Sequence, residues 1–319
     1  MDLSDTELTR CDELWFSDCG LVIRAENTVY RISRDFMAIH SPIFRDMLAL
    51  PSPPNVETFD GCPLVFLPDS EANFTPFLKA LFYHEYVTSR STSSPVLTSI
   101  LRMSHKYEVA SLRKRAAAHL SAVFPTTLAD YDSLSTKKID LAFDLTMYQV
   151  IDVARLTALD WILPAAFYEA VKLCDERDLL RCSMAEDDKL RWVVGCLTMT
   201  ANETGEMIDF LWNPKVVPFC ARRLCEEARI AARRLSEIDR KYSRAELCFM
   251  QGFMPLELWN KGDWEDKNIA DAVCVPCLTA LKRAHARARE SFWRRLPSIF
   301  DLPDWDELEV MKAAVLSEH

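Results

Sequence analysis

Hydrophobic positions near the N-terminus first follow the period of a β-strand. In the segment LVIRA, the apolar residues Leu21, Ile23 and Ala25 alternate with positions on the opposite face, and TVYRIS repeats the alternation after AEN. A period of two is typical of strands, and asparagine tolerates the left-handed backbone conformation of tight turns. The sequence therefore predicts a hairpin within residues 14–33, with Asn27 in its turn.

The hydrophobic period then changes to that of a helix. Residues 34–49 carry apolar side chains at helical spacing: Phe36, Ile39, Ile43 and Met47. Because a residue before proline disfavours the helical conformation, Pro42 predicts that a first helix ends around His40. Ser41 can then cap a second helix, with Pro42 in its first turn.

The pattern continues with one more strand and further helices. PLVFLPD predicts a third strand after the loop PSPPNVETFDGC, and EANFTPFLKALFYHEYV predicts a helix. The buried face of that helix is expected to hold Phe74, Phe77, Leu78, Leu81 and Phe82, and the opposite stripe Thr75, Lys79 and Tyr83. Two helices are predicted within residues 96–124.

A change of organisation is predicted near Pro125, where TTLADYDS interrupts the helical pattern. From about residue 137 the pattern is helical only. Leu163-Pro164 begins one helix, and Ser183 with Glu186 fits a capping box for the next. We expect an α+β fold with an acidic segment over 1–13, an α+β domain over 14–125 and an all-α region over 126–319.

Composition restricts the class of protein. The chain has 319 residues, of which 49% are hydrophobic, and a formal net charge of −10. An acidic chain is not expected to bind nucleic acid non-specifically. No apolar run approaches the length of a membrane span, and the start MDLSDTELTRCDELWF has no signal-peptide pattern. With eleven cysteines in such a chain, we expect a reducing compartment, cytosol or nucleus.

Catalytic motifs are missing from the sequence. The six glycines are too widely spaced for GxGxxG, a P-loop or a GxSxG elbow, and no histidine belongs to HExxH. We therefore expect no enzyme, although a site assembled from distant residues remains an open alternative.

The cysteines are the first candidate for chemistry. Cys274 and Cys277 form a CxxC, and Cys220 with Cys225 forms an earlier pair, a set that fits a closed structural zinc site. Cys248 is a substitute ligand by sequence. His285 is eight residues past Cys277, about 12 Å along a helix, which is too far to share a metal easily.

Two observations keep a metal-free interpretation open. Buried reduced cysteine packs as a small hydrophobic residue without any metal. In addition, a five-residue spacing within one continuous helix would be poor for binding one ion. A CxxC redox centre is less well supported, because no βαβ pattern surrounds it.

Basic residues gather in two helical segments and are the second candidate. They are Arg222, Arg223, Arg229, Arg233, Arg234, Arg240, Lys241 and Arg244 in the first, and Lys282, Arg283, Arg287, Arg289, Arg294 and Arg295 in the second. They could bind an acidic partner or nucleic acid. We favour a solvated face paired with Glu226, Glu227, Glu237, Asp304, Asp306 and Glu307.

The order of elements in the first 125 residues resembles the BTB/POZ domain. The matching segments are WFSDCGLVIRA, VYRISRDFMAIHSPIFRDML, FLKALFYHEYV and HKYEVASLRKRA. The whole chain resembles the BTB-containing proteins of mushroom-forming fungi through DGCPLVFLPD, FPTTLADYD, WILPAAFY and FWRRLPSIFDLPDWDEL. Asp18 matches the family's aspartate, whereas Ser33 stands where many members carry histidine.

The resemblance implies a module that forms homodimers and recruits protein partners, often a cullin of ubiquitin ligases. The candidate interface residues are Trp15, Phe16, Phe36, His40, Lys79 and Tyr83. Large aromatic residues suit such an anchor, but an apolar stripe also suits a simple core. No short cullin-binding element and no recognisable substrate-capturing module is found, so a regulatory scaffold with a zinc-stabilised helical region is the alternative.

Overall fold

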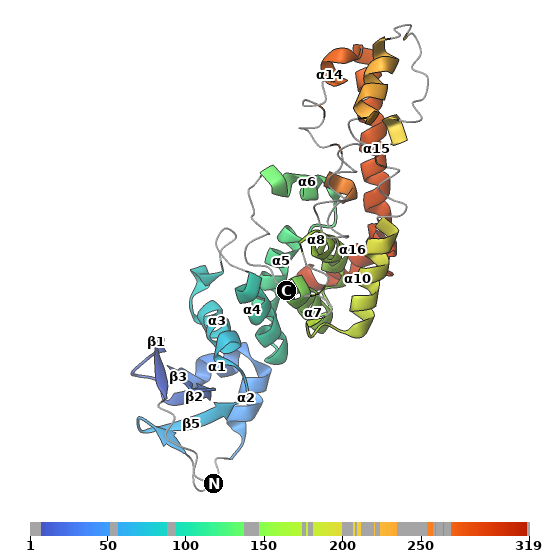
Figure 1. Ribbon diagram of the computed structural model, residues 1–319. Helices are drawn as coiled ribbons and strands as arrows, with labels where there is room; N and C mark the ends of the chain where they lie inside the picture. Colours follow the sequence, from blue (N-terminus) through green and yellow to red (C-terminus); the bar gives the residue numbers. More distant parts are fainter. Residues whose placement is uncertain are drawn as a thin grey trace. The chain divides into compact units, whose positions relative to one another are not determined.

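The computed structural model describes residues 8–51, 57–87, 94–136, 147–173, 177, 181–199, 207, 209–211, 220, 224–234, 254–257, 259, 264 and 269–317. The chain forms two compact units. Unit 1 comprises Met1–Val123, Phe143–Leu159 and Ala314–His319, and unit 2 comprises Phe124–Ala142 and Asp160–Ala313. The first change of unit falls beside Pro125, and two later segments return to unit 1. The fold is α+β: a five-stranded sheet comes first and a mostly helical chain follows (Figure 1).

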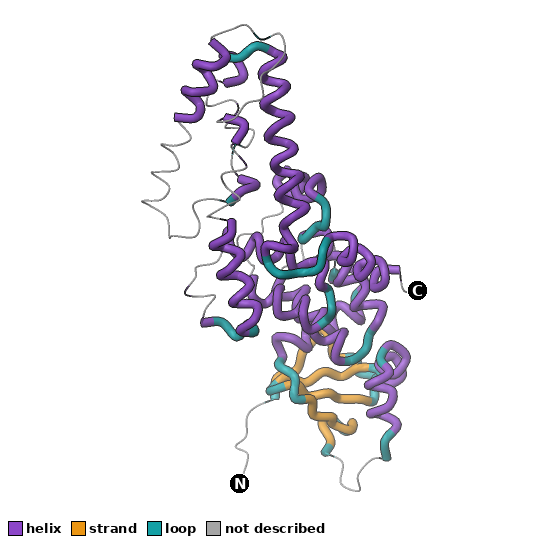
Figure 2. The backbone as a smooth tube through the Cα atoms, turned by 90° about the vertical axis from the view of Figure 1, so that its right-hand side faces the viewer, coloured by secondary structure: helices purple, strands orange, loops and turns teal. Residues whose placement is uncertain are grey.

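The sheet of unit 1 has the strand order β1-β3-β2-β5-β4. Its strands are β1 (Thr9–Trp15), β2 (Leu21–Ala25), β3 (Thr28–Ile32), β4 (Thr58–Phe59) and β5 (Cys62–Leu67). β2 pairs antiparallel with β3 and parallel with β5, while β1 runs parallel to β3. Figure 2 shows the strands together as one sheet, with helices of the same unit next to it.

Seven helical segments lie wholly within the described part of unit 1. They are α1 (Arg34–His40), α2 (Pro42–Ala49), α3 (Glu71–Phe82), the 3-10 turn η1 (His84–Tyr86), α4 (Ser94–Lys106), α5 (Ala110–Val123) and α7 (Met147–Leu156). α4 packs against α3, α5 and α7. Tyr107 is at the centre of the core, with its ring 4.6 Å from that of Phe44 and 5.7 Å from that of Phe77.

The predicted break between α1 and α2 is confirmed. Ser41 has an extended backbone, its hydroxyl accepts a hydrogen bond from the Phe44 N–H, and Pro42 occupies the first turn. The same hydroxyl donates to the Tyr107 carbonyl at 2.5 Å. Ser33 caps α1 by accepting from the Phe36 N–H. The residue where the BTB resemblance shows a departure therefore has a local role as a helix cap.

Three details of the N-terminal prediction were wrong or incomplete. The hairpin is present, but Glu26 rather than Asn27 has the left-handed backbone, with φ of 52°. Residues 9–13, set apart as an acidic segment, form most of β1. β4 was missed. β1 and β4 lie at the sheet edges, where exposed polar residues replace the alternation that identifies inner strands.

The described elements of unit 2 are helical. They are α6 (Leu128–Thr136), η2 (Asp160–Ile162), α8 (Leu163–Leu173), α10 (Glu186–Thr198), a helix over 224–234, η4 (Pro255–Glu257), α14 (Ile269–Ala272), α15 (Val275–Ile299) and α16 (Trp305–Ser317), whose last residues belong to unit 1. α8 packs against α10 and α15. No helix among the described residues is long and apolar enough to cross a membrane.

The capping-box prediction at the start of α10 was wrong. Ala185, not Ser183, is the N-cap, and it makes no side-chain capping bond. Acidic residues fill the first turn instead: Glu186, Asp187 and Asp188. Carboxylates there interact favourably with the positive end of the helix dipole.

The distinctive segment FWRRLPSIFDLPDWDEL forms the corner between α15 and α16. The Trp293 indole donates to the Thr126 carbonyl at 3.0 Å, and the Trp305 indole donates to the Trp293 carbonyl at 2.7 Å. The two tryptophan rings stack with centroids 5.4 Å apart. The spacing of tryptophans in this segment therefore fixes a helix–helix corner.

Candidate metal centre

Four cysteines from two distant segments form a cluster in unit 2: Cys220, Cys225, Cys274 and Cys277. Their sulfur atoms all lie within 4.8 Å of one another. The Cys220 and Cys274 sulfurs are 3.7 Å apart, and the Cys274 N–H donates to the Cys225 sulfur at 3.2 Å. The structure thus brings together the four residues that the sequence analysis proposed as metal ligands.

Two segments of the chain position these sulfurs. Cys220 is not helical, and Cys225 lies in the helix over 224–234, so the five-residue spacing does not fall within one continuous helix. Cys274 is the N-cap of α15, with Pro276 in the first turn, and Cys277 lies at the third helical position. The CxxC spacing therefore places both thiols at the N-terminal end of a 25-residue helix.

The cluster has the chemistry and the size of a four-thiolate site. Zinc bound tetrahedrally at about 2.3 Å from each sulfur would place the sulfurs about 3.8 Å apart. The observed 3.7 Å pair meets this value, and the other pairs need inward movement of about 1 Å or less to reach it. The partial positive charge of a helix N-terminus and the N–H donated to sulfur favour thiolates.

Electrostatics without a cation favour neutral thiols. Burial, together with the Cys220 and Cys274 thiols, raises the pKa of Cys277. The Cys274 N–H lowers the pKa of Cys225, but burial and the neighbouring thiols leave that pKa raised. A bound cation reverses this balance, because a coordinated thiol is deprotonated.

The cysteines belong to a small hydrophobic cluster that we call the tryptophan core. Its buried members are Phe210, Leu211, Cys225, Ala232, Trp259, Trp264, Ile269, Val273, Cys277 and Leu281. The rings of Trp259 and Trp264 are 5.5 Å apart, and Phe210 stacks on Trp264. His285 packs against Phe210 and Trp264.

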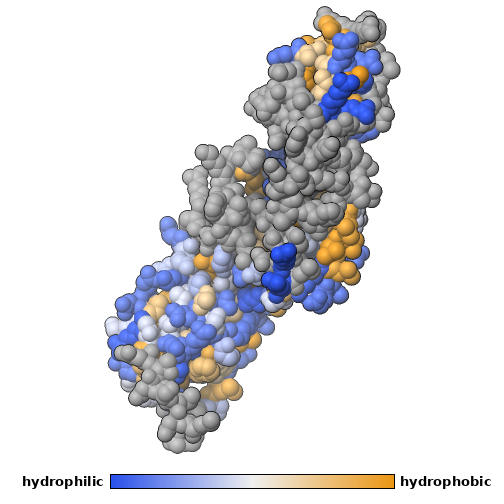
Figure 3. All heavy atoms as spheres, in the orientation of Figure 1, coloured by the Kyte–Doolittle hydropathy of each residue, from blue (hydrophilic) through white to orange (hydrophobic). Residues whose placement is uncertain are grey.

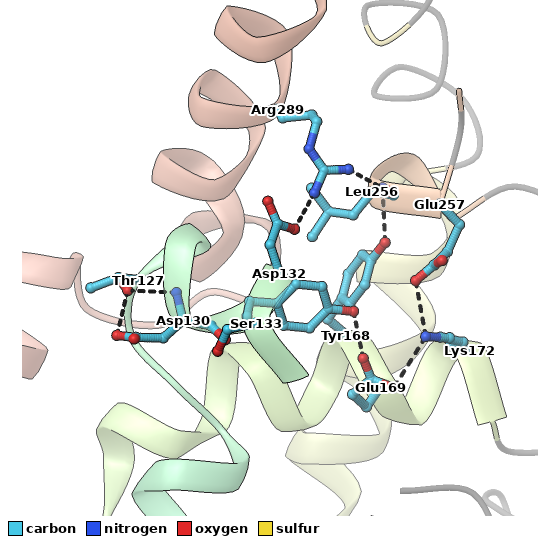
Figure 4. A network of polar contacts seen from close by, with 11 residues as sticks. Thr127, Asp130, Asp132, Ser133, Tyr168, Glu169, Lys172, Leu256, Glu257 and Arg289 are labelled. Atoms are coloured by element: carbon cyan, nitrogen blue, oxygen red, sulfur yellow. Dashed lines mark hydrogen bonds and ion pairs between the residues drawn. The ribbon is translucent and has the colours of Figure 1, made fainter. Parts of the chain in front are cut away.

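A second polar arrangement in unit 2 joins α6, α8, η4 and α15 (Figure 4). Tyr131 donates to the buried Glu169 at 2.6 Å, and Lys172 bridges Glu169 and Glu257 at 3.7 and 2.9 Å. Tyr168 accepts from the Leu256 N–H.

Arg289 completes this arrangement by binding the Leu256 carbonyl at 2.5 Å and the Asp132 carboxylate. Burial, and then Glu169, raises the pKa of Tyr131, which keeps this phenol protonated as a donor. Sequence reasoning missed the set, because its members are spread from residue 131 to residue 289 and no local motif connects them.

The predicted interface residues lie in unit 1, mostly in contact with other side chains of the chain. Phe16 and Phe36 each pack on Phe82, with centroids 5.4 and 4.6 Å apart, and Phe36 also contacts His40. Lys79 pairs with the Glu13 carboxylate, and the Tyr83 hydroxyl donates to the Glu13 carbonyl.

Trp15 lies apart from that group. Its ring meets Phe59, and the Arg10 guanidinium lies 4.6 Å from the ring centroid. The two contacts of Glu13 attach β1 to α3 and its C-terminal end, which gives Lys79 and Tyr83 an internal role within unit 1.

Some residues of the basic segments have partners in the described part of the chain. Arg229 lies 3.9 Å from Glu226, Arg289 pairs with Asp132, and Lys282 lies over the Trp264 ring. Several residues of this prediction fall outside the described ranges: Arg222, Arg223, Glu237, Arg240, Lys241, Arg244 and the substitute ligand Cys248. The Arg229 and Arg289 side chains are only 15% and 16% exposed, so these two residues do not belong to the solvated face that the sequence analysis favoured.

No family model, curated protein or solved structure matches the chain. Function therefore has to be argued from the sites themselves.

Proposed function

We propose that this chain is a non-catalytic protein-interaction scaffold whose unit 1 acts as a BTB-type docking module, forming a homodimer and recruiting a protein partner. The observation that carries the proposal is the exposed apolar side chains of α1 and α2. Ile39 is 79% exposed, Ile43 is 38% exposed, and Leu50 follows the end of α2 at 68%. α1 and α2 contact each other, and large apolar side chains left exposed on neighbouring helices are typical of protein contact surfaces.

The surroundings of these side chains fit a contact surface. The inner side of α1 and α2 is fixed by Met37, Phe44 and Leu48, which are buried. The outer side is therefore held rigidly, which lowers the entropy cost of binding. On the face drawn in Figure 3, hydrophobic residues also interrupt the hydrophilic surface of the described residues.

The test is the mass of the full-length protein in solution by light scattering, for the wild type and Ile39→Lys. Lysine suits the last turn of a helix, so this change adds charge to the surface without weakening α1. Val310→Lys is the matched control, because Val310 is 71% exposed on α16. Phe36 is a poorer choice, since it packs on Phe82 within the chain.

We expect a dimer for the wild type and the control, and a dissociation constant raised about tenfold or more for Ile39→Lys. A monomeric wild type contradicts the dimer proposal. Binding of the same samples to the N-terminal region of a BTB-binding cullin then tests the ubiquitin-ligase adaptor version. If the cullin does not bind, the proposal of a scaffold stands and the proposal of a ubiquitin-ligase adaptor does not.

A second candidate function is favoured by the four-cysteine cluster: a regulatory scaffold whose helical region is stabilised by zinc. Soft thiolate ligands select zinc, copper(I) or iron–sulfur centres, and four thiolates in a tetrahedron suit zinc. A closed site of this kind is structural, because no position is left for water or substrate. The same site is compatible with a docking role for unit 1.

Metal analysis of protein purified without chelators tests this candidate. We expect one zinc per chain, lost in a Cys274→Ser variant and retained in Cys182→Ser, whose cysteine lies outside the cluster. Disulfide-linked cysteines in the purified protein, detected as a mass loss of about 2 Da per bond, would contradict zinc binding.

A further inference from the structure

We infer that metal binding to the four cysteines controls the folding of the tryptophan core while the rest of unit 2 folds without it. The inference rests on the proposed zinc site. On binding, each of the four thiols releases its proton and one divalent cation is bound by four thiolates. The energy of that step then contributes directly to the order of the surrounding core.

The described part of the tryptophan core is small. Among the described residues its buried members include two cysteines, an alanine and a valine, and Cys220, Ala228, Cys274, Leu278 and Ala284 lie at its border. All four cysteines are thus members of this core or packed against it. Small hydrophobic cores commonly need a metal or a disulfide in addition to apolar burial.

The positions of the ligands suit a clip between two helices. Cys225 lies in the helical residues 224–234, Cys220 lies outside a helix, and Cys274 and Cys277 lie at the start of α15. A bound ion would therefore join two segments, and 48 residues lie between Cys225 and Cys274 in the sequence. The loop-closure entropy of such a long segment is the cost that a metal clip offsets.

Other described parts of unit 2 are held together by contacts of their own. Trp161, Phe167 and Tyr168 are fully buried, Tyr131 and Arg289 tie α6 to α8 and to α15, and none of these contacts involves a cluster cysteine. α8 should therefore keep its protection when the metal leaves. This difference provides an internal control within one molecule.

Hydrogen exchange of the full-length protein, followed by mass spectrometry, tests the inference. Zinc-loaded wild type is compared with the same protein after treatment with a strong zinc chelator, and again after zinc is added back. We expect peptides covering 224–234 and 269–281 to exchange about tenfold faster or more without zinc, while peptides covering 163–173 stay unchanged. Zinc addition should restore the slow rates.

Two variants distinguish the loss of the metal from a general defect in folding. Cys274→Ser should reproduce the chelated pattern and not respond to zinc, whereas Cys182→Ser should behave as the wild type. If zinc is bound but its removal leaves the exchange of 224–234 and 269–281 unchanged, this inference is overturned and the zinc site stands. If α8 loses protection to the same extent, the inference is also overturned. Absence of bound metal overturns both.

Discussion

The Tyr131 hydroxyl donates a 2.6 Å hydrogen bond to the buried carboxylate of Glu169, from α6 to α8. This contact satisfies one oxygen of a carboxylate whose side chain is only 3% exposed. Burial is the largest influence on Glu169 and raises its pKa, while Lys172 and Tyr131 lower it only in part. The hydrogen bond between Tyr131 and Glu169 therefore stabilises the packing of α6 against α8. Burying the charged carboxylate costs free energy, and this cost depends on pH.

Because burial disfavours the charged form of Glu169, the effect of Glu169→Gln on the free energy of unfolding should depend on pH. Because the folded-state pKa is raised, the native state binds the proton more tightly, and stability is lost as pH rises from about 4.3, the ordinary glutamate value, through the raised value. The variant keeps an acceptor for Tyr131 and carries no charge. The free energy of unfolding of the variant minus that of the wild type should therefore be larger at pH 8 than at pH 5.

Urea unfolding at both pH values measures this difference, and Glu290→Gln on the exposed side of α15 is the control. An equal effect of Glu169→Gln at both pH values would show that the charge of Glu169 does not matter to folding.

Gly195→Ala should destabilise the protein although alanine is the better helix former. An added Cβ would lie 2.2 Å from the Phe300 ring, which is fully buried and stacks on Phe167 at 5.1 Å. Overpacking costs about 1–3 kcal/mol, whereas the gain in helix propensity is about 1 kcal/mol or less. We therefore expect a net loss in denaturant unfolding. Gly20→Ala, which meets no atom within 4 Å, should be near neutral.

Ser41→Ala should cost more than Ser33→Ala. Both serines cap a helix, which is worth about 1 kcal/mol. Ser41 is fully buried and also donates to the Tyr107 carbonyl, so its loss leaves a second group unpaired, at about 1–3 kcal/mol more. Equal losses from the two variants in thermal or urea unfolding would contradict a role for the Tyr107 contact.

Ala158→Gly should stabilise the protein, while Ala118→Gly should destabilise it. Ala158 follows α7 with φ of 53°, a left-handed conformation that costs alanine about 1 kcal/mol and glycine almost nothing. Ala118 is an exposed interior position of α5, where glycine costs about 1 kcal/mol. Unfolding of the two variants side by side checks the opposite signs, and a loss from both would contradict the strain at Ala158.

Local patterns were sufficient for several elements. The hairpin and the break at Ser41-Pro42 each depend on neighbouring residues, and each is present as predicted. The wrong details are also local but ambiguous, since Asn27 and Glu26 share one turn and only one residue takes the left-handed conformation. Edge strand β1 was missed because its polar residues carry no alternation.

The sequence by itself determined which residues the chain offers: alternating strands, capped helices and two cysteine pairs with ligand spacing. Only the tertiary structure decided that Cys220 and Cys274 meet at 3.7 Å and that Tyr131 reaches Glu169. The physical reason is the separation along the chain over which each kind of interaction acts. Capping and periodicity act over a few residues, whereas these contacts join segments 54 and 38 positions apart, and their geometry depends on how whole helices pack.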